Sequence, residues 1–187
     1  MEFSFHIYNK LAADGIMMAV DKLLGNQPER LPPIVVCVGS DLAVGDSLGP
    51  IAGSLLKYKT QGVYYFLYGT LAAPVTAKEI KYLRQFLKKT HPNNPIIAID
   101  AAVGEKGDIG TIKVTNTPLY PGAGANKQLG TIGDLSILGI VAEKSLTNYG
   151  VLTTTRLNLV YSMSEIISEA LSALLWERTG ENLRKNA

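Results

Sequence analysis

Two acidic residues follow apolar runs that are typical of buried β-strands. Asp46 lies in a glycine-containing loop after residues 34–38, and Asp100 ends the run at 96–99. Ligands of open parallel sheets bind beyond the carboxyl ends of the strands, so we expect both residues at one edge of a sheet. Each has an ordinary structural explanation, because Asp is favoured as a helix N-cap and as a turn residue. Together they predict a pair of functional carboxylates.

Such a pair has a defined chemistry. Two carboxylates held close together cannot both ionise easily, so one of them keeps a proton. The ionised one can activate a water molecule, and the protonated one can donate a hydrogen bond to the scissile carbonyl of a peptide. Asp46 and Asp100 could therefore hydrolyse a peptide bond without a nucleophilic side chain or a metal ion, provided that they are close enough to share a water.

Residues 45–48 read Gly-Asp-Ser-Leu, which is the nucleophile signature of a class of lipases and esterases. A serine nucleophile needs a histidine base. The sequence has two histidines, His6 near the amino terminus and His91 after a lysine-rich segment, and neither follows the pattern of such a base. We therefore do not expect Ser47 to be a nucleophile.

The residue types also argue against a protein-built metal centre. Cys37 is the only cysteine and lies in a β-branched run, as an inert core thiol would. Histidines, cysteines and carboxylates do not cluster at the spacings of metal ligands. We expect no cofactor and no metal ion, although the oxygens of two aspartates could recruit a hard cation.

A second unusual segment, residues 120–127, reads Tyr-Pro-Gly-Ala-Gly-Ala-Asn-Lys. Gly122 and Gly124 would let the backbone approach a ligand, and Lys127 next to Asn126 would supply a positive charge. The segment does not match a phosphate-binding loop or a dinucleotide-binding fingerprint. Its four named residues are candidate substrate-binding residues.

Strand and helix patterns alternate along the chain. Apolar, β-branched runs predict four strands, at residues 34–38, 63–68, 96–99 and 135–142. Helical spacing of apolar residues predicts helices at 1–25, 47–57, 76–89 and 155–178. Residues 26–33 predict a linker, 108–115 a hairpin or edge strand, and 181–187 a frayed tail. The alternation predicts a single α/β domain over residues 1–187, a three-layer α/β/α arrangement with a mostly parallel sheet.

Composition and charge exclude several classes of protein. The chain has 187 residues, 47% of them hydrophobic and 18% charged, which suits one domain and excludes intrinsic disorder. The longest run without a polar side chain, residues 31–39, is too short to span a membrane. A net charge of +2 does not favour a nucleic-acid or membrane partner, and the basic residues between 78 and 89 fit the solvated face of a helix. Without a secretory signal pattern, we expect a cytoplasmic protein.

Several short motifs resemble, in their order, those of the germination protease of spore-forming bacteria. They are Val38-Gly39, Gly45-Asp46-Ser47-Leu48-Gly49-Pro50, Ile99-Asp100-Ala101, Pro121-Gly122-Ala123-Gly124 with Asn126-Lys127, and Gly139-Ile140-Val141. The likeness covers about residues 33–163 and is greatest to the small YyaC-type sporulation proteins of that superfamily. It implies a phosphorylase/hydrolase-like fold, which the hydrogenase maturation proteases share.

The resemblance also implies an activity, that of an atypical aspartic-type endopeptidase, with Asp46 and Asp100 at the positions of the catalytic aspartates. The implied substrates are the small acid-soluble proteins that coat spore DNA, or another sporulation protein, in the forespore or spore interior. A homo-oligomer is compatible with it.

Alternatives to the peptidase remain open. The germination protease is longer, and residues 101–103 depart from it, so a catalytically inactive sporulation or interaction protein on the same fold is one alternative. A nucleic-acid-associated protein that uses helix 76–89 is another. A nickel-recognising maturation protease fits less well, because no histidine lies in a suitable segment.

Overall fold

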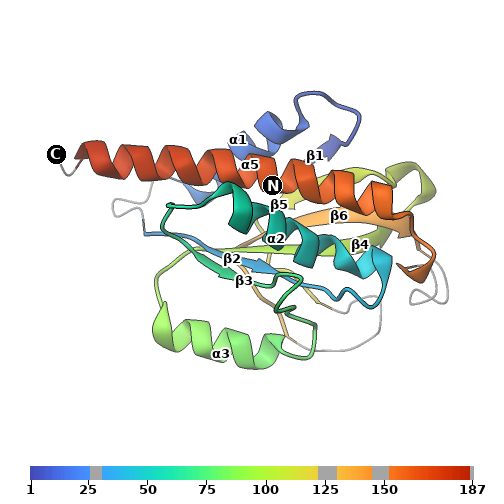
Figure 1. Cartoon of the computed structure of the whole chain (residues 1–187), viewed down its shortest axis with the longest axis horizontal. Helices are drawn as coiled ribbons and strands as arrows, with labels where there is room; N and C mark the ends of the chain where they lie inside the picture. Colours follow the sequence, from blue (N-terminus) through green and yellow to red (C-terminus); the bar gives the residue numbers. More distant parts are fainter. Residues whose placement is uncertain (26–30, 122–129, 145–151, 186–187) are drawn as a thin grey trace.

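The computed structural model describes residues 1–25, 31–121, 130–144 and 152–185, which form an alternation of strands and helices (Figure 1). The strands are β1 (Glu2–His6), β2 (Ile34–Cys37), β3 (Phe66–Tyr68), β4 (Ile96–Gly104), β5 (Thr111–Thr115) and β6 (Leu135–Glu143). The helices are α1 (Ala12–Leu24), α2 (Leu48–Lys59), α3 (Ile80–Thr90) and α5 (Leu157–Lys185), with short 3-10 turns η1 (Val44–Ser47) and η2 (Lys106–Asp108). None of the helices described is long and apolar enough to cross a membrane.

The described strands form a six-stranded, mostly parallel sheet of order β1-β5-β6-β4-β2-β3. The predicted central strands are confirmed, because β2 pairs in parallel with both β3 and β4, and β4 pairs in parallel with β6. β5 runs antiparallel to β6 and to β1.

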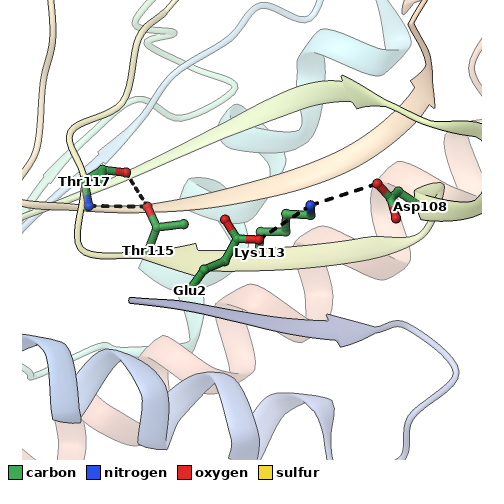
Figure 2. A network of polar contacts seen from close by, with 5 residues as sticks. All are labelled: Glu2, Asp108, Lys113, Thr115 and Thr117. Atoms are coloured by element: carbon green, nitrogen blue, oxygen red, sulfur yellow. Dashed lines mark hydrogen bonds and ion pairs between the residues drawn. The ribbon is translucent and has the colours of Figure 1, made fainter.

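Strand β1 was not predicted, and its presence corrects two expectations. The helix expected over residues 1–25 begins only at Ala12, and the segment 108–115 contributes an internal strand, since β1 covers the outer edge of β5. Five alternating residues give a weak strand signal by themselves, and β1 depends on pairing with a segment a hundred residues away. Figure 2 shows partly exposed ion pairs beside these strands, in which the Lys113 ammonium lies 3.6 Å from Glu2 of β1 and 3.9 Å from Asp108 of η2.

Helices cover both faces of the sheet, which confirms the predicted three-layer fold. α1, α2 and α5 lie on one face and α3 lies on the other (Figure 1). Alternate residues of β2 enter the two cores, with Val35 and Cys37 on the side of α5 and Ile34 and Val36 on the side of α3. Strands buried on both faces explain the continuous apolar runs in the sequence.

Two helix boundaries differ from the prediction. α3 begins at Ile80 and not at residue 76, after a turn in which the Glu79 carboxylate accepts the Thr76 N–H at 2.9 Å. α5 continues through Gly180 to Lys185, so its predicted end is wrong, and residues 181–185 of the expected tail are helical. Glycine inside a helix costs about 1 kcal/mol, which is too little to end a helix by itself.

Candidate functional site

The connections that follow β2 and precede β4 use opposite faces of the sheet. After β2 the chain passes through η1 into α2, on the side of α5, and reaches β3. From β3 it returns through α3, on the other face, to β4, which lies on the far side of β2. The strand order reverses between β2 and β4, because β2 leads to β3 on one side of this pair and β4 leads to β5 on the other, and ligands of open α/β sheets bind beyond the carboxyl ends of the strands at such a switch point. η1, which carries Asp46, contacts β4, which carries Asp100, at this switch point.

Asp100 lies inside β4, so the expectation that it ends its strand and starts a turn is wrong. β4 continues to Gly104 because β6 remains paired with it, with Leu138 opposite Asp100. On the other side, pairing with β2 stops one residue earlier, where the Val38 N–H donates to the Ile99 carbonyl at 2.7 Å. Asp100 is therefore the first residue of β4 beyond the point where β2 leaves it.

The surroundings of the Asp100 carboxyl group disfavour its ionised form. Its side chain lies on the same side of the sheet as buried Ala98, because residues two apart in a strand share a face, and the residue is only 8% exposed. Burial raises the pKa of Asp100 well above its usual range, and the charge of Asp46 raises it further. One hydrogen bond, from the Ala101 N–H to Oδ1 at 2.8 Å, partly offsets these effects.

Asp46 is half-buried within η1 and does not cap a helix. Neither η1 nor α2 has a side-chain cap hydrogen bond, and Ser47 occupies the N-cap position of α2, so the N-cap interpretation of Asp46 is wrong. Burial raises the pKa of Asp46, and a hydrogen bond from the Ser40 backbone lowers it in part. The carboxylate is thus partly withdrawn from water without stabilising the helix that follows it.

Backbone contacts hold Asp46 in place. The Ser40 N–H donates to the Asp46 carbonyl at 3.1 Å, which closes the loop between β2 and η1. Gly39 has a φ of 140°, and a Cβ atom there would lie 2.0 Å from that carbonyl oxygen. Gly49, in the first turn of α2, is equally restricted, because its Cβ would lie 2.0 Å from the Val38 carbonyl oxygen.

The roles of Gly39 and Gly49 were not predicted. Both occur in the motifs quoted from the sequence, but the sequence shows only that glycine stands there. The close approach of α2 to the end of β2 explains why no larger residue fits. A glycine directly after a strand is the signal that could have indicated such a constraint.

Ser47 has the surroundings of a structural residue. It is buried, and its hydroxyl group donates to the Val44 carbonyl at 2.6 Å. Nε2 of His6 lies 3.3 Å from the Ile109 carbonyl near edge strand β1, and the ring of His91 stacks on Phe66. The described contacts therefore give Ser47 no histidine partner.

The other candidate residues contribute nothing further to the site. The substrate-binding candidates Gly122, Gly124, Asn126 and Lys127 lie outside the described residues. Cys37 is buried in the core, and burial raises the pKa of its thiol, which disfavours the reactive thiolate. Within the described part of the chain, no group of three or more His, Cys, Asp or Glu residues is placed to hold a metal ion.

Comparison with known proteins gives two matches. Residues 4–170, which include both aspartates, match the family described as "Protein of unknown function (DUF1256)". The "Uncharacterized protein YyaC" of Bacillus subtilis (strain 168) is 43% identical to this chain over 148 residues, which are 79% of this chain and 71% of YyaC. Neither description states an activity.

Proposed function

This chain belongs to the DUF1256 family, and we propose that it is an aspartic-type endopeptidase with Asp46 and Asp100 as its catalytic residues. The observation that carries the proposal is the placement of the two carboxyl groups at one switch point, where neither of them caps a helix or forms an ion pair among the described residues. A protein gains no stability from such a pair. Buried carboxyl groups with a raised pKa and no stabilising partner are characteristic of functional sites.

The two environments assign the roles. Asp100 is the more buried group, and the Asp46 charge opposes its ionisation, so Asp100 holds the proton and Asp46 carries the charge. Asp46 takes a proton from a water molecule as the water oxygen attacks the carbonyl carbon of the substrate. Asp100 hydrogen-bonds the carbonyl oxygen and transfers its proton to it as negative charge develops there, which leaves Asp100 ionised and the tetrahedral intermediate neutral.

The tetrahedral intermediate then collapses, and the C–N bond breaks. The proton on Asp46 passes to the leaving amine, and the carbonyl reforms as its oxygen returns a proton to Asp100. Both carboxyl groups regain their starting states, and no covalent bond to the protein forms. Ser47 has no part in these steps.

As substrate we propose the small acid-soluble proteins of spores or another protein of the sporulating cell, with the forespore or spore interior as the location. Two observations support this proposal. The motifs around both aspartates resemble those of the germination protease in their order, and the identity to YyaC supports the likeness to its small relatives. On the same grounds we propose that the three-layer fold is of the phosphorylase/hydrolase-like type.

The test is incubation of the purified chain with small acid-soluble spore proteins, followed by mass spectrometry of the products. We expect the natural sequence to cleave, and Asp46→Asn and Asp100→Asn to be inactive while remaining folded. Asp41→Asn, which removes an exposed charge from the same loop, is the matched control and should cleave normally.

Two outcomes would contradict the proposal. One is cleavage by Asp46→Asn at the natural rate. The other is intact spore proteins after long incubation with the natural sequence, a result that would favour the inactive interaction protein. Ser47→Ala should cleave, and its failure while folded would instead favour a serine nucleophile.

A further inference from the structure

Helix α3 carries a concentration of positive charge that the rest of the molecule does not share. Residues 78–89 contain five basic side chains and one acidic one, a net charge of +4, whereas the whole chain has a net charge of +2. The remainder of the chain is therefore net negative, at −2. Lys81, Arg84 and Lys88 lie on one exposed stripe of α3, because residues three and four apart share a helix face. Among the described contacts, none of these three side chains forms an ion pair.

The exposed side of α3 also presents aromatic rings. Tyr82 is 72% exposed and Phe86 is 47% exposed, one helical turn apart and beside the basic stripe. The Phe86 ring lies edge-to-face with Tyr68 of edge strand β3, with the ring centroids 6.3 Å apart. Among the described residues, one nitrogen of Arg84 donates to the Thr131 carbonyl at 3.4 Å. Exposed aromatic residues next to arginine and lysine are typical of protein interfaces.

On the opposite face of the molecule, α5 has an exposed stripe of complementary character (Figure 1). Glu165 and Glu169 lie one turn apart on it, with Tyr161 one turn before them and Trp176 two turns after. Neither glutamate forms an ion pair within the described structure. The ammonium group of nearby Lys59 lies 3.5 Å from the backbone carbonyl of Glu165.

We propose that this chain associates with itself, with the basic α3 surface of one copy docked on the acidic α5 stripe of the next. The spacing fits, because Arg84 and Lys88 on one helix and Glu165 and Glu169 on the other are each four residues, or about 6 Å, apart along the helix axis. Tyr82 and Phe86 would then bury apolar area against the aromatic residues of the α5 stripe.

The placement of the two helices determines the kind of assembly. Because α3 and α5 cover opposite faces of the sheet, each copy uses a different surface for each neighbour. Such head-to-tail contacts form rings or open chains instead of closed two-fold dimers. Pairing of two α3 helices is disfavoured, because it would place four basic side chains against four. A contact between two single helices is small, so we expect weak association that depends on concentration.

A second copy fits the α3 surface better than a nucleic acid or an anionic membrane. The complementary acidic and aromatic residues are present on the molecule itself, and the chain outside α3 is net negative, which opposes the approach of a polyanion. Binding of α3 to duplex DNA or to anionic vesicles is therefore an outcome that would count against self-association.

Sedimentation velocity over a range of protein concentrations tests the proposal. We expect the fraction of protein in larger species to increase with protein concentration. That fraction should decrease as salt is raised from about 0.1 M to about 1 M, because the Debye length falls from about 10 Å to about 3 Å. Trp176 is the only tryptophan and is 50% exposed, so its fluorescence emission should move to shorter wavelength as copies associate.

Charge reversal makes the test specific. Arg84→Glu with Lys88→Glu, and separately Glu165→Lys with Glu169→Lys, should each weaken self-association by more than about tenfold, because like charges would face each other. An equimolar mixture of the two variants should associate again, since each interface then joins opposite charges. Lys10→Glu with Lys106→Glu reverses two exposed charges elsewhere and should associate like the natural sequence.

Three results would overturn the proposal. They are a monomer at every concentration, association that survives both charge reversals, and a mixture of the two variants that remains monomeric. Saturable binding of the α3 surface to duplex DNA or anionic vesicles, without self-association, would assign that surface to another partner.

Discussion

Aspartates lie at both ends of the parallel strands β4 and β6, and they differ in burial and in hydrogen bonding. At the amino ends, exposed Asp134 links β6 to β4, because its Oδ2 accepts the Ile96 N–H at 2.8 Å and its own N–H donates to the Ile96 carbonyl at 2.8 Å. At the carboxyl ends, Asp100 is buried, and its hydrogen bond comes from its own neighbour, Ala101. Asp134 strengthens the sheet, whereas Asp100 weakens it when charged.

The comparison shows how the environment of a structural carboxylate differs from that of the two proposed catalytic ones. The Asp134 carboxylate is exposed to water and accepts a hydrogen bond from a backbone N–H of the neighbouring strand, so it keeps polar partners in the folded protein. Asp100 and Asp46 are each partly or wholly withdrawn from water, and burial raises the pKa of both. The following predictions test this difference.

The largest effect is expected on peptidase activity. Asp46→Asn and Asp100→Asn should each lower kcat by about 10³-fold or more, since each removes one half of the acid–base pair. The double variant should be little worse than either single one, because residues that act as a unit lose function non-additively. Steady-state cleavage rates of the three variants measure this. Effects that multiply would contradict a shared mechanism.

The stability of Asp100→Asn should depend on pH in a defined direction. Because the pKa of Asp100 is raised in the folded protein, the folded state holds this proton more tightly than the unfolded chain does. Its stabilising contribution is complete below the unfolded pKa of about 4 and is lost as the pH rises through the folded pKa. Asn carries no charge at any pH, so we expect Asp100→Asn to be more stable than the natural sequence at neutral pH.

That gain should shrink as the pH falls and should vanish below about 4, where Asp100 is protonated in both states. Denaturant unfolding at several pH values measures it, with Asp41→Asn as the control for an exposed charge. A variant that is less stable than the natural sequence at neutral pH would show that Asp100 supports the fold as Asp134 does.

Asp134→Ala should show the opposite behaviour. It removes the acceptor of the Ile96 N–H and should lower the free energy of unfolding by about 1 kcal/mol. Peptidase activity should remain, because the residue lies at the far end of the strands. Asp134→Asn keeps an acceptor oxygen and should lose less stability than Asp134→Ala. Loss of activity in a folded Asp134→Ala would contradict the division between the two ends.

A smaller effect is expected on the titration of Asp100. Asp46→Asn removes the charge that opposes ionisation of Asp100, so the pKa of Asp100 should fall. It should stay above its usual range, because burial is the larger cause of the shift. Carboxyl carbon chemical shifts followed over pH by NMR measure this. An unchanged titration would show that the two carboxyl groups do not interact.

Chelation of metal ions should have no effect. The proposed mechanism uses only the two carboxyl groups and water, so activity should be the same with and without a chelator. Inhibition that one added divalent cation reverses would instead show that the aspartates act as oxygen ligands of that cation.

Much of the architecture was predictable because local burial leaves a local pattern. The continuous apolar runs at 34–38 and 96–99 indicated strands covered on both sides, and β2 and β4 are central and parallel. The parallel strands in turn indicated that Asp46 and Asp100 would lie at one edge. β1 was missed, because a short edge strand depends on a distant partner and carries little pattern of its own.

The residue types alone limited the possible chemistry, since the sequence contains two aspartates next to buried apolar runs and no suitable base for Ser47. The surroundings of those aspartates follow from the packing of the folded chain. β6 pairs with β4 beyond Asp100 while β2 leaves it, and the close approach of α2 to β2 brings η1, with Asp46, against β4 at the same edge of the sheet. The cost of burying a charge depends on every group that displaces water around it. Those groups come from segments far apart in the sequence, so no local pattern contains that information.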